Sequence, residues 1–211
     1  GDVDFDFGHP EAVPGHIEAA IGAVLAQDCA ALVIGGDHFV SYPSLCAHAL
    51  KHGDGLALIQ FDAHCDTGRD DGRRIDHGTM FHHAAERGVV DPDRSIQVGI
   101  RTTYPETRYT VRSADTVHEE GIDATVQAIR DRVGSGPCYL TFDIDSLDPA
   151  FAPGTGTPVC GGLSTWQAKA ILGRLGGLDL VGMDVVEVSP PYDQAEITAL
   201  AGATVALELL C

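Results

Sequence analysis

The sequence predicts a single α/β domain of three layers, in which a mainly parallel sheet lies between two layers of helices. Short apolar runs typical of strands alternate with amphipathic helical patterns, and repeated βα units form parallel sheets that are covered on both faces. A length of 211 residues suits one domain of this kind and is short for two. Ligand-type residues follow several of the strands, as expected where the site lies at one edge of such a sheet.

Each predicted strand is a short run rich in valine, isoleucine and leucine. Continuous apolar runs are typical of parallel strands buried on both faces, whereas half-exposed strands alternate apolar and polar residues. The run at 109–111 is the shortest and weakest of them. The strands predicted are, in chain order, 31–34, 56–61, 96–100, 109–111, 138–142 and 180–186.

The predicted helices lie between the strands and carry apolar residues at three- and four-residue spacing. In the first of them Ile17, Ile21 and Leu25 recur on one face just before the first strand. Ser164 and Gln167 form a capping-box pattern at the start of a later helix. The helices predicted are, in order, 17–25, 42–51, 78–87, 122–133, 164–175 and 197–205.

The composition is strongly acidic, with 31 acidic residues against 13 lysines and arginines and a formal net charge of −18. Nucleic acids and anionic membranes both bind to basic surfaces, so we expect neither as a partner. A negative field favours a small cationic substrate, but a merely soluble acidic surface explains most of the charge at least as well.

The six cysteines show no paired spacing, and Cys138 lies in an apolar run where a thiol packs as a small hydrophobic group. We therefore expect free thiols and a reducing, cytoplasmic location rather than a disulfide framework. The sequence contains no apolar run of membrane-spanning length and no signal peptide. It begins with Gly1 in a polar stretch, so we expect that an N-terminal portion of the parent protein is missing.

Two short clusters of ligand-type residues follow predicted strands directly. Side chains alternate along an extended chain, so Asp62, His64 and Asp66 share one face, and Asp143 and Asp145 share another. Carboxylates gathered in this way repel and desolvate one another unless cations lie between them. Oxygen ligands outnumber imidazoles here, which favours hard cations, with Mn²⁺ ahead of Zn²⁺.

Two more ligand-type residues lie at strand ends. His38 follows the strand 31–34, and Glu187 follows the strand 180–186. The sites of parallel α/β sheets lie beyond the carboxyl ends of the strands, where the two clusters also fall. Four separate segments therefore converge on one edge, and the sequence predicts a metal-dependent hydrolase.

Several long motifs, occurring in the same order along the chain, resemble those of the ureohydrolases, the family of arginase and agmatinase. The resemblance covers essentially the whole chain and is most marked to the bacterial agmatinase branch. The motifs that carry it are GGDH at 35–38, DAHCD at 62–66, DHGTMF at 76–81, FDIDSLDP at 142–149 and GMDVVE at 182–187.

The resemblance implies an arginase-like fold with two Mn²⁺ ions per subunit. The implied ligands are His38 and Asp66 for one ion, His64 and Asp145 for the other, and Asp62 and Asp143 as bridges. Such a pair of ions would lower the pKa of a water from about 15.7 towards neutrality. That water would then attack the carbon of a guanidinium group.

The resemblance also implies roles for residues that do not bind metal. Glu187 would hold the guanidinium in a charge-assisted contact, with a buried salt bridge as the structural alternative. His77 would deliver a proton to the leaving amine, although a loop histidine beside a glycine is otherwise a solvent-facing residue. Asp37 is expected to hold His38 or a backbone amide.

The expected reaction is hydrolysis of agmatine to putrescine and urea. Arg69, Arg73 and Arg74 could instead pair with the carboxylate of a substrate such as 4-guanidinobutanoate, although loop arginines are usually solvated or paired with neighbouring acids. Arginine is a further alternative. The family also implies a homo-oligomer, either a trimer or a hexamer.

Two other classes of protein compete with this prediction. A zinc deacetylase of related fold uses one metal and fewer carboxylates, so His38, Asp66 and Asp145 count against it. A non-catalytic member of the family usually loses metal ligands, whereas all six expected ones are present.

Overall fold

The computed structural model describes residues 1–6, 8–69 and 75–211. Its centre is a sheet of six strands in the order β1-β6-β5-β2-β3-β4, and every neighbouring pair is parallel. The predicted parallel α/β architecture is confirmed. The strands are β1 (Ala31–Ile34), β2 (Ala57–Phe61), β3 (Ile96–Ile100), β4 (Thr110–Ser113), β5 (Pro137–Asp143) and β6 (Asp179–Val186).

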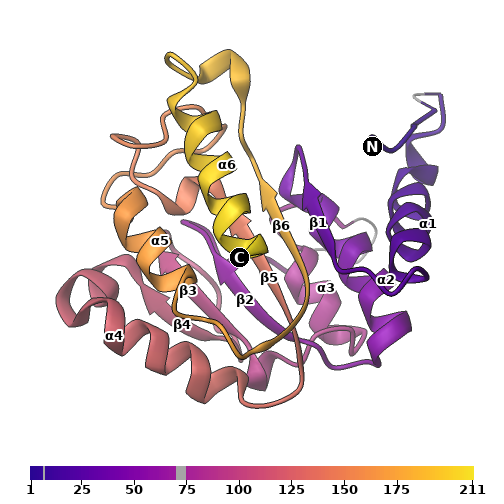
Figure 1. Cartoon of the computed structure of the whole chain (residues 1–211), viewed down its shortest axis with the longest axis horizontal. Coiled ribbons are helices and arrows are strands. Elements are labelled where there is room, and N and C mark those ends of the chain that lie inside the picture. Colours follow the sequence, from indigo (N-terminus) through magenta and orange to yellow (C-terminus); the bar gives the residue numbers. More distant parts are fainter. Residues whose placement is uncertain (7, 70–74) are drawn as a thin grey trace.

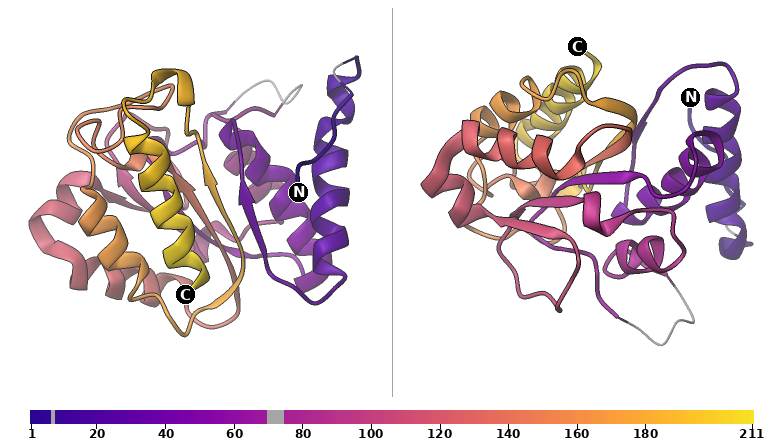
Figure 2. Two further views of the ribbon diagram at one scale, coloured as in Figure 1. Left: turned by 45° about the horizontal axis from the view of Figure 1, so that its top comes forward. Right: turned by 90° about the horizontal axis from the view of Figure 1, so that it is seen from below.

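Helices cover both faces of the sheet, which gives the three predicted layers (Figure 1). Figure 2 shows the first two helices on one side of the strands and the last two on the other. The helices are α1 (Val13–Leu25), α2 (Ser41–His52), α3 (Met80–Glu86), α4 (Ala114–Val133), α5 (Thr165–Leu172) and α6 (Ile197–Leu210). Short 3₁₀ helices include η2 (His38–Val40) and η4 (Ile144–Ser146).

Alternate residues of the central strands pack into two separate cores. Ile59 and Phe61 of β2 face the core formed with α4, α5 and α6. Leu56, which precedes β2, and Leu58 within it pack instead with α2 and α3. The strand is therefore buried on both faces, and this explains its continuous apolar sequence.

Several helix boundaries differ from the sequence prediction: α1 begins at Val13 rather than at residue 17, and α6 ends at Leu210 rather than at residue 205. Helix α4 begins at Ala114 rather than near residue 122, because the Ser113 side chain accepts a hydrogen bond from the Thr116 amide and caps it. The helical pattern is hidden there by a kink at Gly121, whose φ of 84° lies in the left-handed region. Helix α5 has the predicted capping box at Ser164 and ends at Leu172 rather than Leu175.

The strand order places the four site segments side by side. They follow β1, β6, β5 and β2, which are consecutive strands in the sheet. The chain runs from β2 outward to β3 and β4, then returns to β5 and runs to β6 on the other side. The sheet therefore changes winding direction between β2 and β5, and parallel sheets bind ligands at such a switch point.

The described helices include none with the length and apolar character that a membrane crossing needs. All six cysteines are free thiols, as expected. Cys65 and Cys138 are buried, while Cys29, Cys160 and Cys211 are exposed.

Candidate metal centre and catalytic site

His38 lies at the bottom of the candidate site. It is fully buried, and its Nδ1 faces three carboxylates, at 3.2 Å from Asp62 Oδ2, 3.1 Å from Asp66 Oδ2 and 3.2 Å from Asp143 Oδ2. Within the described part of the chain this nitrogen nevertheless has no partner in hydrogen-bond geometry. The other ring nitrogen, Nε2, lies 2.8 Å from Thr141 Oγ1.

A second group shares Asp62 with the first. His64 Nδ1 lies 3.0 Å from Asp145 Oδ2 and 3.4 Å from Asp62 Oδ1. Potential ligand atoms of these three residues lie within 4.8 Å of one another, as do those of His38, Asp62 and Asp143. All six residues predicted as ligands therefore meet in two adjoining groups, and Asp143 faces His38 with one oxygen.

Backbone amides near the strand ends fix the carboxylates. The His64 amide donates to Asp62 Oδ1 at 2.7 Å, and the Asp145 amide donates to Asp143 Oδ1 at 2.8 Å. The Ala63 amide donates to Asp145 Oδ1 at 2.9 Å and so ties the segment after β2 to η4. The second oxygens of Asp62 and Asp143 face His38 and that of Asp145 faces His64, while Asp62 Oδ2 also accepts a hydrogen bond from Gln60 Nε2 at 2.8 Å.

The clustering shifts the pKa values of these groups strongly. Burial, with the neighbouring Asp62 charge next, raises the pKa of Asp66 to about 6 and that of Asp143 well above its usual range. Burial opposes ionisation of Asp62 too, but the neighbouring imidazoles of His38 and His64 outweigh it and lower the pKa of that carboxyl. Hydrogen bonds to Asp145 and Asp62 raise the pKa of His64 to about 10. Bound protons therefore reduce the repulsion among the clustered carboxylates.

The donor set fits divalent cations. Octahedral coordination at about 2.1 Å places neighbouring ligand atoms about 3 Å apart, which is the spacing observed around His38 Nδ1. Buried polar atoms almost always have partners, so a buried imidazole nitrogen that faces three carboxylates without a hydrogen bond fits the surroundings of a bound cation. Protein metal sites that combine carboxylates with imidazoles suit Mn²⁺ and its neighbours.

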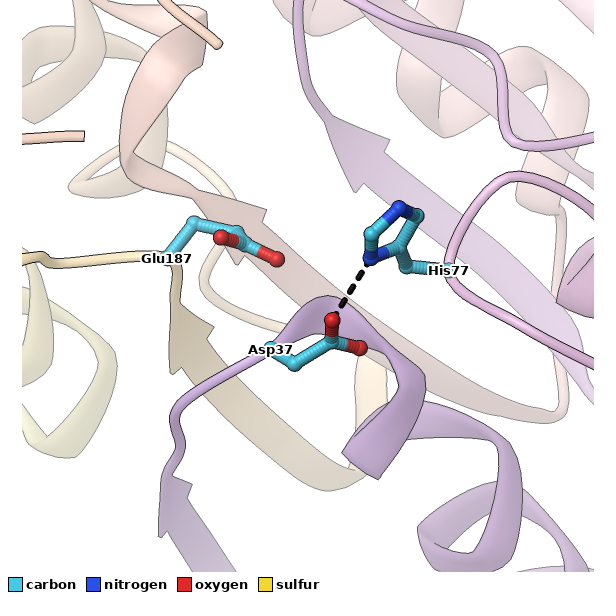
Figure 3. Close-up of side chains that lie close together, drawn as sticks. All are labelled: Asp37, His77 and Glu187. Carbon is cyan, nitrogen blue, oxygen red and sulfur yellow. Dashed lines mark hydrogen bonds and ion pairs between the residues drawn. The ribbon is translucent and has the colours of Figure 1, made fainter. Parts of the chain in front are cut away.

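A second, more exposed cluster lies beside this centre and contains Asp37, His77 and Glu187 (Figure 3). His77 Nδ1 lies 2.6 Å from Asp37 Oδ2, and this contact is the first cause of the raised pKa of His77. Glu187 accepts the His38 amide hydrogen at 2.7 Å, which connects the cluster to the buried centre. Burial raises the pKa of Glu187.

The comparisons with known proteins agree with this geometry. The family model described as the arginase family matches residues 1–211. The agmatinase of Neisseria meningitidis serogroup A is 55% identical over 211 residues, which cover 100% of this chain and 68% of the relative. The chain belongs to the arginase family.

Solved structures of the family superpose closely on this chain. A hypothetical agmatinase from Burkholderia thailandensis is 54% identical with a TM-score of 0.98, over 100% of this chain and 68% of that one. The proclavaminate amidino hydrolase of Streptomyces clavuligerus is 38% identical with a TM-score of 0.93, over 100% and 73%. The arginase-like fold and the hydrolase class predicted from the sequence are therefore confirmed.

The sequence prediction did not identify a row of buried polar residues beneath the centre. These residues pair in register across four neighbouring strands, and all are fully buried. Two of them, Gln60 and Thr141, stand two residues before Asp62 and Asp143 and so share their face. A polar residue inside an apolar strand was the available signal. The row consists of Gln97, Gln60, Thr141 and Asp184.

Two smaller predictions can also be compared with the structure. Asp37 accepts a hydrogen bond from the Phe39 amide at 2.9 Å, as expected, but its other contact is with His77 and not with the His38 ring. Arg69 is exposed and lines a groove with Arg108 and His82. Arg73 and Arg74 lie outside the described residues.

Proposed function

We propose that this protein hydrolyses agmatine to putrescine and urea at a centre of two Mn²⁺ ions. The observation that carries the proposal is the pair of ligand groups that share Asp62 at the switch point of the sheet. Membership of the arginase family supports the reaction type, and the agmatinase relatives support the substrate.

The six predicted ligands would hold the ions, with His38 and Asp66 on one ion and His64 and Asp145 on the other. Asp62 would bridge the two, and Asp143, which the structure places beside His38, would complete the bridge. Four carboxylates balance two divalent charges, so the filled centre is close to neutral. When bound, the two cations lower the pKa of a water and so supply a nucleophile at neutral pH.

Glu187 would bind and orient the guanidinium group of the substrate. One of its oxygens accepts the His38 amide hydrogen, which fixes the side chain and leaves the second oxygen for the substrate. A carboxylate opposite a planar guanidinium makes a strong charge-assisted hydrogen bond. Because the same contact ties Glu187 to His38, the guanidinium carbon would be held close to the metal centre.

His77 would carry the proton that the leaving amine requires. The hydrogen bond to Asp37 raises the pKa of His77, so this imidazole retains a proton to a higher pH than an ordinary histidine. Its side chain is 61% exposed, so it can exchange that proton with solvent between turnovers. Histidine general acids of this kind typically contribute about 10²–10⁴-fold to a rate.

The substrate is tested by comparing kcat/KM for agmatine, 4-guanidinobutanoate and arginine, with urea and amine products both measured. Family members act on different amidino compounds, so urea release alone does not identify the substrate. We expect agmatine to be preferred, because a protein of net charge −18 favours a doubly cationic substrate over one with a carboxylate. A preference for the guanidino acid would overturn the agmatine assignment and leave the ureohydrolase mechanism standing.

The metal centre is tested by substitutions that separate ligands from substrate contacts. Asp145→Asn should remove one Mn²⁺ and nearly all activity, whereas Glu187→Gln should keep both ions and lose substrate binding and turnover together. Metal content is measured on the same samples. Loss of the ions from Glu187→Gln would show that this residue is a metal ligand and not a substrate contact.

A further inference from the structure

A further buried carboxylate lies beneath the metal centre, and the proposed mechanism does not use it. Asp184 is fully buried in the middle of β6, and a buried carboxylate is costly unless it is well hydrogen-bonded. Three hydroxyl groups donate hydrogen bonds to it: Ser41 Oγ at 2.7 Å, Tyr139 Oη at 2.8 Å and Thr141 Oγ1 at 2.6 Å. All three hydroxyl-bearing residues are themselves buried.

The directions of these hydrogen bonds follow from the chemistry of the groups. An ionised carboxylate only accepts, so the Thr141 hydroxyl donates its single hydrogen to Asp184. The Thr141 oxygen can then only accept at its 2.8 Å contact with His38 Nε2, which must carry the hydrogen. A neutral His38 therefore has its hydrogen on Nε2 and a free lone pair on Nδ1.

This tautomer is the one that a metal needs. His38 Nδ1 faces the oxygens of Asp62, Asp66 and Asp143. Imidazoles that bind metals usually donate their second N–H to a carboxylate or carbonyl, which fixes the ring and makes the ligating nitrogen more basic. Here a threonine hydroxyl stands between the ring and the carboxylate.

We propose that Asp184, acting through Thr141, is the positioning residue that holds His38 in its metal-binding tautomer and orientation. The inference rests on the proposed metal centre. It applies to one ion only, because within the described residues the structure gives no comparable contact to Nε2 of His64, whose side chain is 30% exposed. We call the chain of hydrogen bonds from Asp184 through Thr141 to His38 the relay. Its loss should weaken one Mn²⁺ site and spare the other.

The relay can be cut without emptying the space around Asp184. Thr141→Val keeps the shape of the side chain and removes the hydroxyl, while Ser41 and Tyr139 still donate to Asp184. Thr141→Ser restores the hydroxyl and serves as the rescue variant. Thr125→Val is the matched control, because Thr125 is also fully buried and hydrogen-bonded, but in α4 and away from the centre.

The experiment is a Mn²⁺ titration of the metal-free protein, with free Mn²⁺ followed by electron paramagnetic resonance. We expect Thr141→Val to weaken one of two sites by about 10–100-fold, the usual effect of removing a group that orients a metal ligand. Thr141→Ser and Thr125→Val should bind both ions as wild type does. Asp184→Asn should reproduce the loss at the same site, and circular dichroism shows whether each variant is folded.

Different failures have different meanings. Wild-type protein that does not bind two ions would overturn the proposed metal centre, and the relay with it. Wild-type protein that binds two ions, together with Thr141→Val of unchanged affinity, would overturn the relay alone. An equal loss in Thr125→Val would also overturn it, because general loss of a buried hydroxyl would then explain the effect.

Discussion

At the scale of single residues, the site depends on backbone conformations that its side chains disfavour. Asp66 and Glu187 both have φ in the left-handed region, at 51° and 66°. Such conformations cost free energy for residues other than glycine and persist where the surrounding structure enforces them. Both residues directly follow buried segments, so the turn that strains them also directs their carboxylates into the site.

The Asp37–His77 contact gives a prediction for the pH dependence of turnover. Replacing Asp37 by Asn removes the carboxylate whose hydrogen bond, and then its charge, raises the pKa of His77. The pKa should fall towards its ordinary value, near 6.5. Because the protonated form is the proton donor in the proposed mechanism, the decline of kcat on the alkaline side should move to lower pH. NMR titration of the His77 ring and the pH profile of kcat measure the two effects independently.

His77→Asn is the reference variant for this prediction. It should lower kcat by about 10²-fold or more at every pH, because it removes the proposed general acid itself. Asp37→Asn should match wild type at low pH and fall behind it as pH rises, with metal content unchanged. A pH profile of Asp37→Asn that coincides with wild type would show that Asp37 does not control His77.

The fold class was sufficient to predict that the six ligand-type residues meet, because it brings the strand ends together. Strand alternation was the wrong reason, since β2 ends at Phe61, Asp66 has a left-handed φ and Asp145 lies in η4. The sequence was insufficient for the Asp37–His77 contact, which joins residues 40 positions apart through two loops. Asp184 was missed for a different reason. It is the single acidic residue of the predicted strand 180–186, which is otherwise apolar, and only the register with Thr141 reveals its partner.

At the scale of elements, β6 is the strand on which most of the site depends. It carries Asp184 within it and Glu187 directly after it, and it pairs with both β1 and β5. Its position relative to α2 is set at Gly182, where a Cβ atom would lie 2.1 Å from His48 Nε2. His48 is fully buried, so its ring has no room to withdraw.

Gly182→Ala should therefore destabilise the protein by about 1–3 kcal/mol, the usual effect of overpacking a core. Chemical denaturation measures the free energy of unfolding. The double variant Gly182→Ala with His48→Ala should be more stable than the two single effects added together predict, because the clash is removed. Strict additivity in this cycle would mean that the two side chains do not meet.

Helix prediction succeeded or failed according to whether the signals were local. The capping box at Ser164 and Gln167 is a local pattern, and the structure forms both of its hydrogen bonds. The start of α4 was missed because Gly121 interrupts the apolar spacing, while residues on each side of it remain helical. Periodicity over a long window cannot recognise a helix that changes direction within it.

At the scale of the whole molecule, the cluster of buried acids opposes folding until cations neutralise it. Burial raises the pKa values of Asp66, Asp143 and Asp145, so in the metal-free protein these groups take up protons on folding. A carboxyl with a higher pKa in the folded state loses stabilisation as pH rises through that pKa. As pH rises above about 4, the metal-free protein should therefore lose the stabilisation that these protonated groups contribute. Binding of Mn²⁺ should compensate for that loss.

Binding of Mn²⁺ should raise the melting temperature, and the increment should grow with pH. One ion at a free concentration of 100 times its Kd adds about 2.7 kcal/mol, or about 5–10 °C for a protein of this length. As pH falls through about 6, the pKa of Asp66, its proton competes with the metal and the increment should shrink. Scanning calorimetry at pH 5.5 and 8, with and without Mn²⁺, measures this. Asp145→Asn should lose the part of the rise in melting temperature that one ion provides. A full rise in that variant would contradict the assignment of Asp145 as a ligand.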